Sequence, residues 1–149
     1  MVVTFTYRVG DVDDATGPIR TKRKKKATNV AFVRGDVISF QTGTGVLMSA
    51  TTHGPYGVCH KDAPLGTKDV EVLWNTKATI YIKLGAGCVY DAYVAAGAAK
   101  AAPFVYGTTV PTLLLGQLVK PGTSVYDGVQ QPTAASEDLD IGGIILGFQ

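Results

Sequence analysis

The sequence predicts an all-β protein, a compact β-barrel or β-sandwich of short strands with an extended N-terminal arm and at most one short helix. Apolar residues alternate with polar ones at a period of two in several short segments, as in strands that bury one face. Eighteen glycines and seven prolines supply the many turns that short strands require. With 149 residues, 46% of them hydrophobic and 17% charged, the chain is typical of one globular domain.

Two segments near the middle of the chain, 69–74 and 78–84, predict a β-hairpin around the polar residues 75–77. In each segment, alternate apolar residues share one face, and we expect that face in the core. These residues are Val70, Val72 and Trp74 in the first segment, and Ile80, Ile82 and Leu84 in the second.

The N-terminal part of the chain differs from the rest in charge. Residues 2–9 alternate and predict a strand, whereas residues 10–26 predict an exposed loop or arm that becomes ordered only against a partner. Six of the fourteen basic residues fall within seven positions there, which leaves eight basic and twelve acidic residues elsewhere, a balance of −4. We therefore divide the chain into an N-terminal strand and basic arm, residues 1–26, and a single β-barrel or β-sandwich domain, residues 27–149.

Further strands are expected at 29–33, 36–40, 46–48 and 56–60, between glycine and proline turns. The alanine-rich segment 91–102 favours a short helix capped by Asp91, although Gly97 opposes it. The remaining chain predicts strands at 104–106, 113–119 and 139–148, with a turn-rich surface segment at 120–136.

Residues with catalytic or metal-binding chemistry are few. Ser49, His60 and Asp62 would supply a triad, but no serine lies in a Gly-x-Ser-x-Gly turn. Cys59 and His60 are neighbours in an expected strand, so their side chains point to opposite faces. The potential metal ligands, which lack the spacing of zinc sites, are His53, Cys59, His60 and Cys88. We therefore expect no enzyme, no metal and no cofactor, and two reduced cysteines that pack as small apolar residues.

The sequence also bears on the compartment of the protein. No window of about 18 uncharged apolar residues exists, so we expect no membrane-spanning segment. Residues 1–8 lack the basic start, apolar centre and cleavage site of a signal peptide. These features predict a protein that is made in a cytosol-like compartment and stays there.

The basic run is the predicted partner-binding site. It consists of Arg20, Lys22, Arg23, Lys24, Lys25 and Lys26. Three interpretations remain open: a solvated loop, contact with an acidic groove of a protein partner, and weak binding of nucleic acid. No aromatic residue is interleaved in the run, which argues against base stacking and therefore against nucleic acid. The acidic balance of the remaining chain favours contact with a neighbouring protein subunit.

Four short, glycine-containing stretches form a pattern across roughly residues 30–149, which is weakest in 113–128. They are Val33-Arg34-Gly35-Asp36-Val37-Ile38, Tyr56-Gly57-Val58-Cys59, Ala63-Pro64-Leu65-Gly66 with the following Val70-Glu71-Val72, and Asp140-Ile141-Gly142-Gly143-Ile144. Together they resemble the small capsid decoration (cement) proteins of tailed bacteriophages and related archaeal viruses. The basic run does not belong to this pattern.

The resemblance implies a structural protein on the outside of an icosahedral capsid. Proteins of this family commonly form homotrimers and clamp adjacent subunits of the major capsid protein, and they carry no catalytic residues. The resemblance therefore implies a virion location after synthesis in the host cytoplasm.

A second hypothesis is a β-sandwich module on a virion or cell surface that binds a ligand or carbohydrate. Its aromatic contacts would come from Trp74, Tyr90, Tyr93 and Tyr106. Trp74, however, lies on an alternating strand and is expected in the core.

Overall fold

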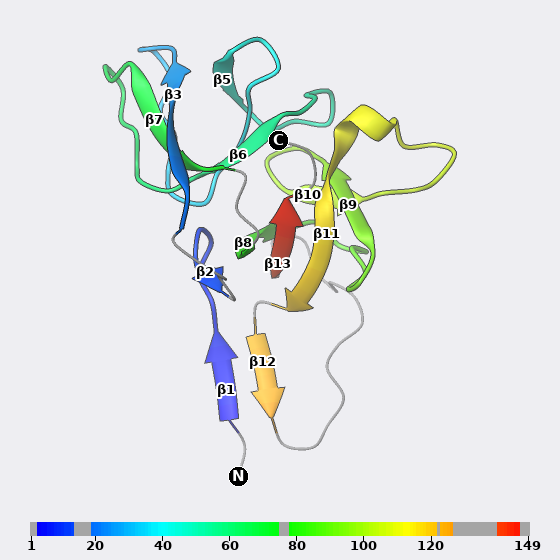
Figure 1. The fold of residues 1–149 in the computed structure, drawn as a ribbon. Coiled ribbons are helices and arrows are strands. Elements are labelled where there is room, and N and C mark those ends of the chain that lie inside the picture. Colours follow the sequence, from blue (N-terminus) through cyan, green and yellow to red (C-terminus); the bar gives the residue numbers. More distant parts are fainter. Residues whose placement is uncertain (1–2, 14–18, 75–77, 122, 127–139, 147–149) are drawn as a thin grey trace.

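The structure is a computed structural model that describes residues 3–13, 19–74, 78–121, 123–126 and 140–146 (Figure 1). It confirms the all-β prediction, since the helical structure of the described part is one 3₁₀ turn, Pro111–Leu113 (η1). The strands are β1 (Val3–Thr6), β2 (Val12–Asp13), β3 (Thr21–Lys26), β4 (Val37–Ser39), β5 (Thr44–Leu47), β6 (Tyr56–Cys59), β7 (Asp69–Leu73), β8 (Thr79–Leu84), β9 (Tyr93–Ala96), β10 (Ala101–Pro103), β11 (Leu114–Pro121), β12 (Thr123–Tyr126) and β13 (Asp140–Leu146).

The first half of the chain forms a closed barrel in the order β3-β5-β4-β6-β7. Strand β3 closes it: it runs parallel to β5 and antiparallel to β7, in register from Thr21 opposite Leu73 to Lys25 opposite Asp69. Because every strand has a neighbour on each side, the barrel has no free sheet edge at these strands.

The second half forms a six-stranded sheet in the order β10-β9-β11-β13-β8-β2. A parallel pairing of Ala101 with Leu84 also joins β10 to β8, so that β8, β13, β11, β9 and β10 make a ring of strands. Strand β2 pairs with the beginning of β8, at Thr79 and Ile80, whereas β10 pairs with its end, at Leu84. We call the two units the first barrel (β3–β7) and the second ring (β8–β11 with β13).

Strands of the first barrel contribute side chains to two separate hydrophobic cores. One hydrophobic core lies inside the first barrel and contains Phe32, Ile38, Phe40, Cys59, Ala63, Val70 and Val72. The other contains the buried side chains of the second ring together with Val37, Met48, Tyr56, Val58 and Leu73 of the first barrel. Successive side chains of a strand point to opposite faces. Strands β4, β6 and β7 are therefore apolar on two faces, one for each core.

A two-stranded ribbon extends away from both units. Strands β1 and β12 pair antiparallel, with Val3 opposite Tyr126 and Thr6 opposite Thr123. Figure 1 shows the ribbon projecting from the body at the end where β11 and β2 meet it. The sequence predicted the first of these strands, and the second falls within the expected turn-rich segment. Residues 120 and 121 of that segment end β11, and residues 122 and 127–136 lie outside the described residues.

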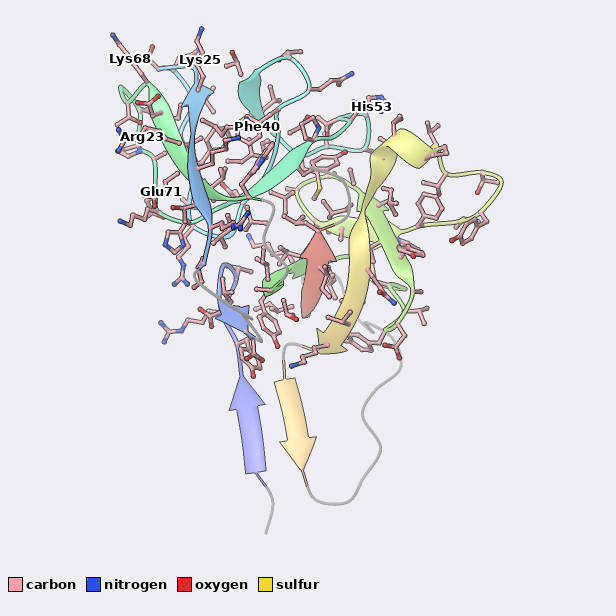
Figure 2. The ribbon with its side chains drawn as sticks, in the orientation of Figure 1. Arg23, Lys25, Phe40, His53, Lys68 and Glu71 are labelled. Atoms are coloured by element: carbon pink, nitrogen blue, oxygen red, sulfur yellow. The ribbon has the colours of Figure 1, made fainter. Side chains whose placement is uncertain are left out.

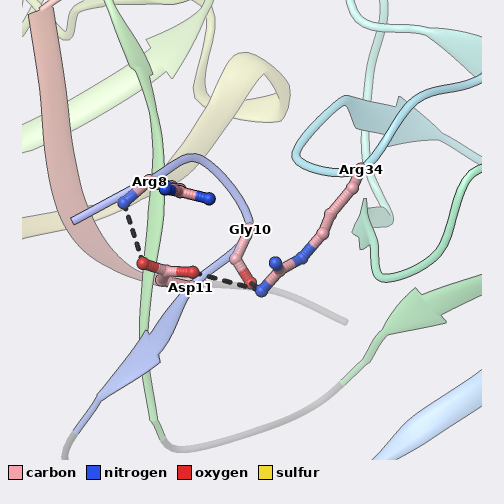
Figure 3. Close-up of polar contacts among 4 residues, drawn as sticks. All are labelled: Arg8, Gly10, Asp11 and Arg34. Carbon is pink, nitrogen blue, oxygen red and sulfur yellow. Dashed lines mark hydrogen bonds and ion pairs between the residues drawn. The ribbon is translucent and has the colours of Figure 1, made fainter.

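The ribbon is fastened to the body by the turn that follows β1. Arg34 donates hydrogen bonds from Nη2 to the Gly10 carbonyl (3.1 Å) and to Asp11 Oδ1 (3.2 Å), while the Arg8 backbone N–H donates to Asp11 Oδ2 (2.8 Å), as Figure 3 shows. Gly35 has a φ of +93°, and a Cβ there would lie 2.6 Å from the Cβ of Val9. A side chain at position 35 would therefore separate the turn from the first barrel.

Four predictions about single elements are wrong. The segments 69–74 and 78–84 are strands, but they form no hairpin, because β7 pairs with β3 and β6 while β8 pairs with β13, β2 and β10. Strand β7 belongs to the first barrel and β8 to the second ring. The expected helix at 91–102 consists of β9, a tight turn and β10, with Asp91 at a positive φ of 70°. The expected strands at 29–33 and 104–106 are loops, of which the first makes one bridge, from Phe32 to Ala63.

Candidate partner-binding surface

The basic run lies within the first barrel and is not a loose arm. Residues Thr21–Lys26 form β3, which pairs with β7 over five residues and with β5 over two. The prediction of an exposed loop is therefore wrong for these residues, and the boundary between residues 26 and 27 falls next to a barrel strand. The sequence suggested an arm because five consecutive cations, Lys22 to Lys26, resemble a solvated loop. Within a strand, however, alternate cations have different environments.

The outward face of β3 carries Arg23 and Lys25. In the β3–β7 ladder, Arg23 is directly opposite Glu71 and Lys25 is opposite Asp69. Glu71 also forms an ion pair with Lys61 (Nζ to Oε2, 3.7 Å). Figure 2 shows Arg23, Lys25 and Glu71 around the outside of the barrel, away from Phe40. Cross-strand neighbours of opposite sign attract each other, so this face has little net charge.

The other face of β3 carries Lys22 and Lys24, which lie over aromatic rings. Lys24 Nζ is 4.1 Å from the ring centroid of Trp74 and 5.4 Å from that of Phe40, and Lys22 Nζ is 5.6 Å from the Trp74 centroid. Ammonium groups at these distances are attracted by the ring electrons. Trp74 in turn meets Phe40 edge to face, with centroids 5.8 Å apart. The two lysines are thus held over one indole by neighbouring strands.

Lys26, on the same face as Lys22 and Lys24, is buried with only 3% of its surface exposed. Its ammonium donates to the carbonyls of Ala27 (2.9 Å), Thr67 (2.8 Å) and Val30. An ammonium has three donors, so these bonds satisfy it completely. Lys26 therefore fastens the loops at one end of the first barrel and is not available to a partner.

The two histidines come from the loop before β6 and from the residue after β6, where the His60 backbone N–H donates to the Glu71 carbonyl (2.9 Å). His53 Nδ1 shares a hydrogen bond of 2.6 Å with Thr112 Oγ1, which links the loop before β6 to η1. His60 follows β6, and its Nδ1 is buried without a hydrogen-bond partner in the described part of the chain. The structure therefore places the two imidazoles in separate environments.

Both cysteines are free, as expected, and the structure buries them fully. Burial raises the pKa of the Cys59 thiol to about 12, with smaller contributions from the nearby carboxylates of Asp36 and Asp62. Burial also raises the pKa of Cys88. Thiols with raised pKa values are poor nucleophiles and poor metal ligands near neutral pH.

The residues considered for a catalytic triad have structural roles. Asp62 Oδ1 accepts the backbone N–H of Arg34 (2.7 Å), and Ser49 Oγ is 3.3 Å from Thr51 Oγ1 within a turn. Among the described residues, no group of three or more His, Cys, Asp or Glu side chains is arranged to hold a metal ion.

The aromatic residues of the carbohydrate hypothesis belong to different units. Trp74 follows β7 and packs partly buried against the core of the first barrel, so the core prediction for it is confirmed in part. Tyr90 packs against the core of the second ring, whereas Tyr93 on β9 and Tyr106 in the loop before η1 are exposed. Lys24 lies over the indole, which leaves less of the ring for a sugar.

Comparisons with known proteins add no relative. No protein-family model matches the sequence, and searches among curated proteins and solved structures find no match. In the described part of the chain, no helix is long and apolar enough to cross a membrane.

Proposed function

We propose that this protein is a structural protein that binds the outside of an icosahedral viral capsid and stabilises contacts between major capsid protein subunits. Two observations support this function: the resemblance to capsid decoration proteins and, above all, the projecting β1–β12 ribbon. A compact body with a projecting ribbon suits a protein that spans two neighbouring subunits.

The ribbon offers backbone groups to a partner. Each of its strands pairs with the other, and no other described strand pairs with the outer edge of β1 or of β12. A strand edge with unpaired N–H and C=O groups is a template for another strand. The partner is therefore expected to add a strand to this ribbon, with backbone hydrogen bonds supplying affinity.

A second contact is available on the loop between β10 and η1. Three exposed apolar side chains lie in this short loop: Val105, Tyr106 and Val110, with Tyr106 78% exposed. The Tyr106 ring meets Phe104 edge to face, with centroids 5.2 Å apart. Figure 1 shows this loop projecting from the body on the side away from β3. Exposed aromatic residues are typical of interface anchors.

The mechanism follows from mass action. A protein that binds assembled capsid and not free subunits stabilises the assembled state. Three copies joined as a homotrimer raise the effective concentration of each contact, so that individually weak contacts suffice. The site of action is the virion surface, and the partners are the major capsid protein and other copies of this chain.

Removal of β1 tests the proposal. Deleting residues 1–26 would be too disruptive, because it removes β3 and opens the first barrel. A variant that begins at Tyr7 lacks only the ribbon strand and keeps Arg8, Gly10 and Asp11. We expect it to have the circular dichroism spectrum and thermal midpoint of the full chain, but to lose sedimentation with the icosahedral particles of its virus. Full attachment of this folded variant would contradict the role of the ribbon.

Two proline substitutions locate the contact within β1. In an antiparallel pair, the N–H groups of successive residues point alternately toward the partner strand and away from it. Of Thr4→Pro and Phe5→Pro, one therefore removes an N–H that faces β12 and the other removes an N–H at the free edge. The free-edge variant, identified by normal hydrogen-exchange protection of β12, is expected to lose attachment. Attachment by both variants would exclude strand addition to β1.

A further inference from the structure

A surface hollow lies beside the start of β3. It has a volume of about 470 Å³ and is lined by Ile19, Arg20, Thr21, Lys22 and Trp74. The backbone N–H of Trp74 donates to the Arg20 carbonyl (3.2 Å), which holds the end of β7 against the residue before β3. The hollow is thus built on strands of the first barrel.

The cations around this hollow lack acidic neighbours. On β7, Lys22 lies opposite Val72 and Lys24 opposite Val70, and within the described residues no ion pair joins Arg20 or any cation of β3 to a carboxylate. The outward residues Arg23 and Lys25 differ, because they have acidic residues directly opposite on β7. The positive charge of β3 is therefore uncompensated mainly on the Trp74 side.

We propose that this hollow binds carboxylate side chains of an acidic peptide segment. Lys22 and Lys24 are held over the indole, so less of their conformational freedom is lost when an anion binds between them. Arg20 contributes a guanidinium, which pairs with carboxylates through two parallel hydrogen bonds. The identification of the segment as part of the major capsid protein rests on the proposed function, whereas the binding of acidic peptide does not.

An acidic peptide fits this site better than nucleic acid does. Stacking of a base requires an open aromatic face, but Lys24 lies over the Trp74 ring and Phe40 meets the ring edge to face. A nucleic acid also needs a long row of free cations. Here the row is short, because Glu71 and Asp69 lie opposite the outward cations of the same strand.

Trp74 is the only tryptophan of the chain and reports directly on the site. The experiment titrates the full-length protein with a hexaglutamate peptide at low salt, by tryptophan fluorescence and by calorimetry. We expect saturable binding that weakens as salt is added. The double variant Lys22→Gln with Lys24→Gln should bind at least about tenfold more weakly, since charged hydrogen bonds are lost. The matched control, Arg23→Gln with Lys25→Gln, removes the same charge from the outward face and should stay within about twofold of the wild type.

Three other results would contradict the proposal. The absence of peptide binding to the wild-type protein, or equal weakening in both double variants, would mean that the hollow is not the site. Tighter binding of an oligothymidylate of equal charge would identify a nucleic-acid site instead. If the first double variant fails to fold, Lys22→Gln alone is used, because Lys22 is exposed, and it should weaken binding at least about threefold. Sedimentation with capsids is measured separately, so that loss of the proposed function and loss of peptide binding are distinguished.

Discussion

The first barrel and the second ring are closed by strands of opposite character. The second ring closes through β9 and β10, where the small side chains of Ala95, Ala96 and Ala101 are buried. The first barrel closes through β3, in which five of six residues are cations. Lysine performs this role because its stem is apolar and its ammonium can reach a polar partner at the end. Small barrels can thus be closed by little side-chain volume or by long amphipathic side chains.

The two units also depend on each other to different degrees. The core of the first barrel is small and made by its own strands, whereas the core of the second ring extends to Val37, Tyr56 and Leu73 of the first barrel. Strand β7 contributes to both cores: Val72 lies in the core of the first barrel, and its neighbour Leu73 lies in the core of the second ring. Substitutions at these two positions therefore test whether the units unfold together.

We expect the largest effect from Leu73→Ala. This side chain is fully buried, and its truncation leaves a cavity between the two units, so the free energy of unfolding should fall by about 2–5 kcal/mol. Urea unfolding followed by circular dichroism should show one transition, because both units lose the same contact. Val72→Ala is the matched comparison, with a loss of about 1–3 kcal/mol in the first barrel alone. Two separate transitions in the Leu73 variant would show that the units are independent.

The next largest effect is expected from Lys26→Met, which keeps the length of the stem and removes the ammonium. The carbonyls of Ala27, Val30 and Thr67 lose their shared donor, and the loss of these three part-buried charged hydrogen bonds should destabilise the fold by about 2–4 kcal/mol in total. Lys25→Met removes a cation from the exposed face and should change the free energy of unfolding by less than about 0.5 kcal/mol. Thermal unfolding of both variants measures the difference, and equal effects would show that the carbonyl contacts of Lys26 contribute nothing.

Alternation in the sequence predicted which faces are buried but not which strands are neighbours. Val70 and Val72 lie in a core as expected, and Trp74 packs against it. The partners of β7 are β3 and β6 and not β8, because a period of two reports the environment of a side chain and carries no information on pairing. The turn-like residues 75–77 suggested a hairpin, although β7 and β8 belong to different units.

The sequence predicts which residues form the candidate site, but it does not predict how their side chains are arranged. The run Arg20–Lys26 was identified from charge alone, but its separation into outward, indole-facing and buried cations requires the strand register. Aromatic partners of Lys22 and Lys24 come from β7 and from the end of β4, so no inspection of the run itself could find them. An alternation of lysines at positions 22, 24 and 26 was the one available signal.

The smallest effect near neutral pH concerns the two cysteines, one in each core. The folded-state pKa of Cys59 is raised to about 12, above an ordinary value of 9.0, so the folded protein holds this proton more tightly than the unfolded chain. The stabilisation is complete below about pH 9 and is lost as the pH rises toward 12, by at most about 1.4 kcal/mol per pH unit. Urea unfolding between pH 8 and pH 11 should show this slope, and Cys59→Ala should reduce it. Cys88→Ala should reduce it less, because no carboxylate adds to burial in raising the pKa of Cys88. An unchanged slope in the Cys59 variant would assign the pH dependence to other groups.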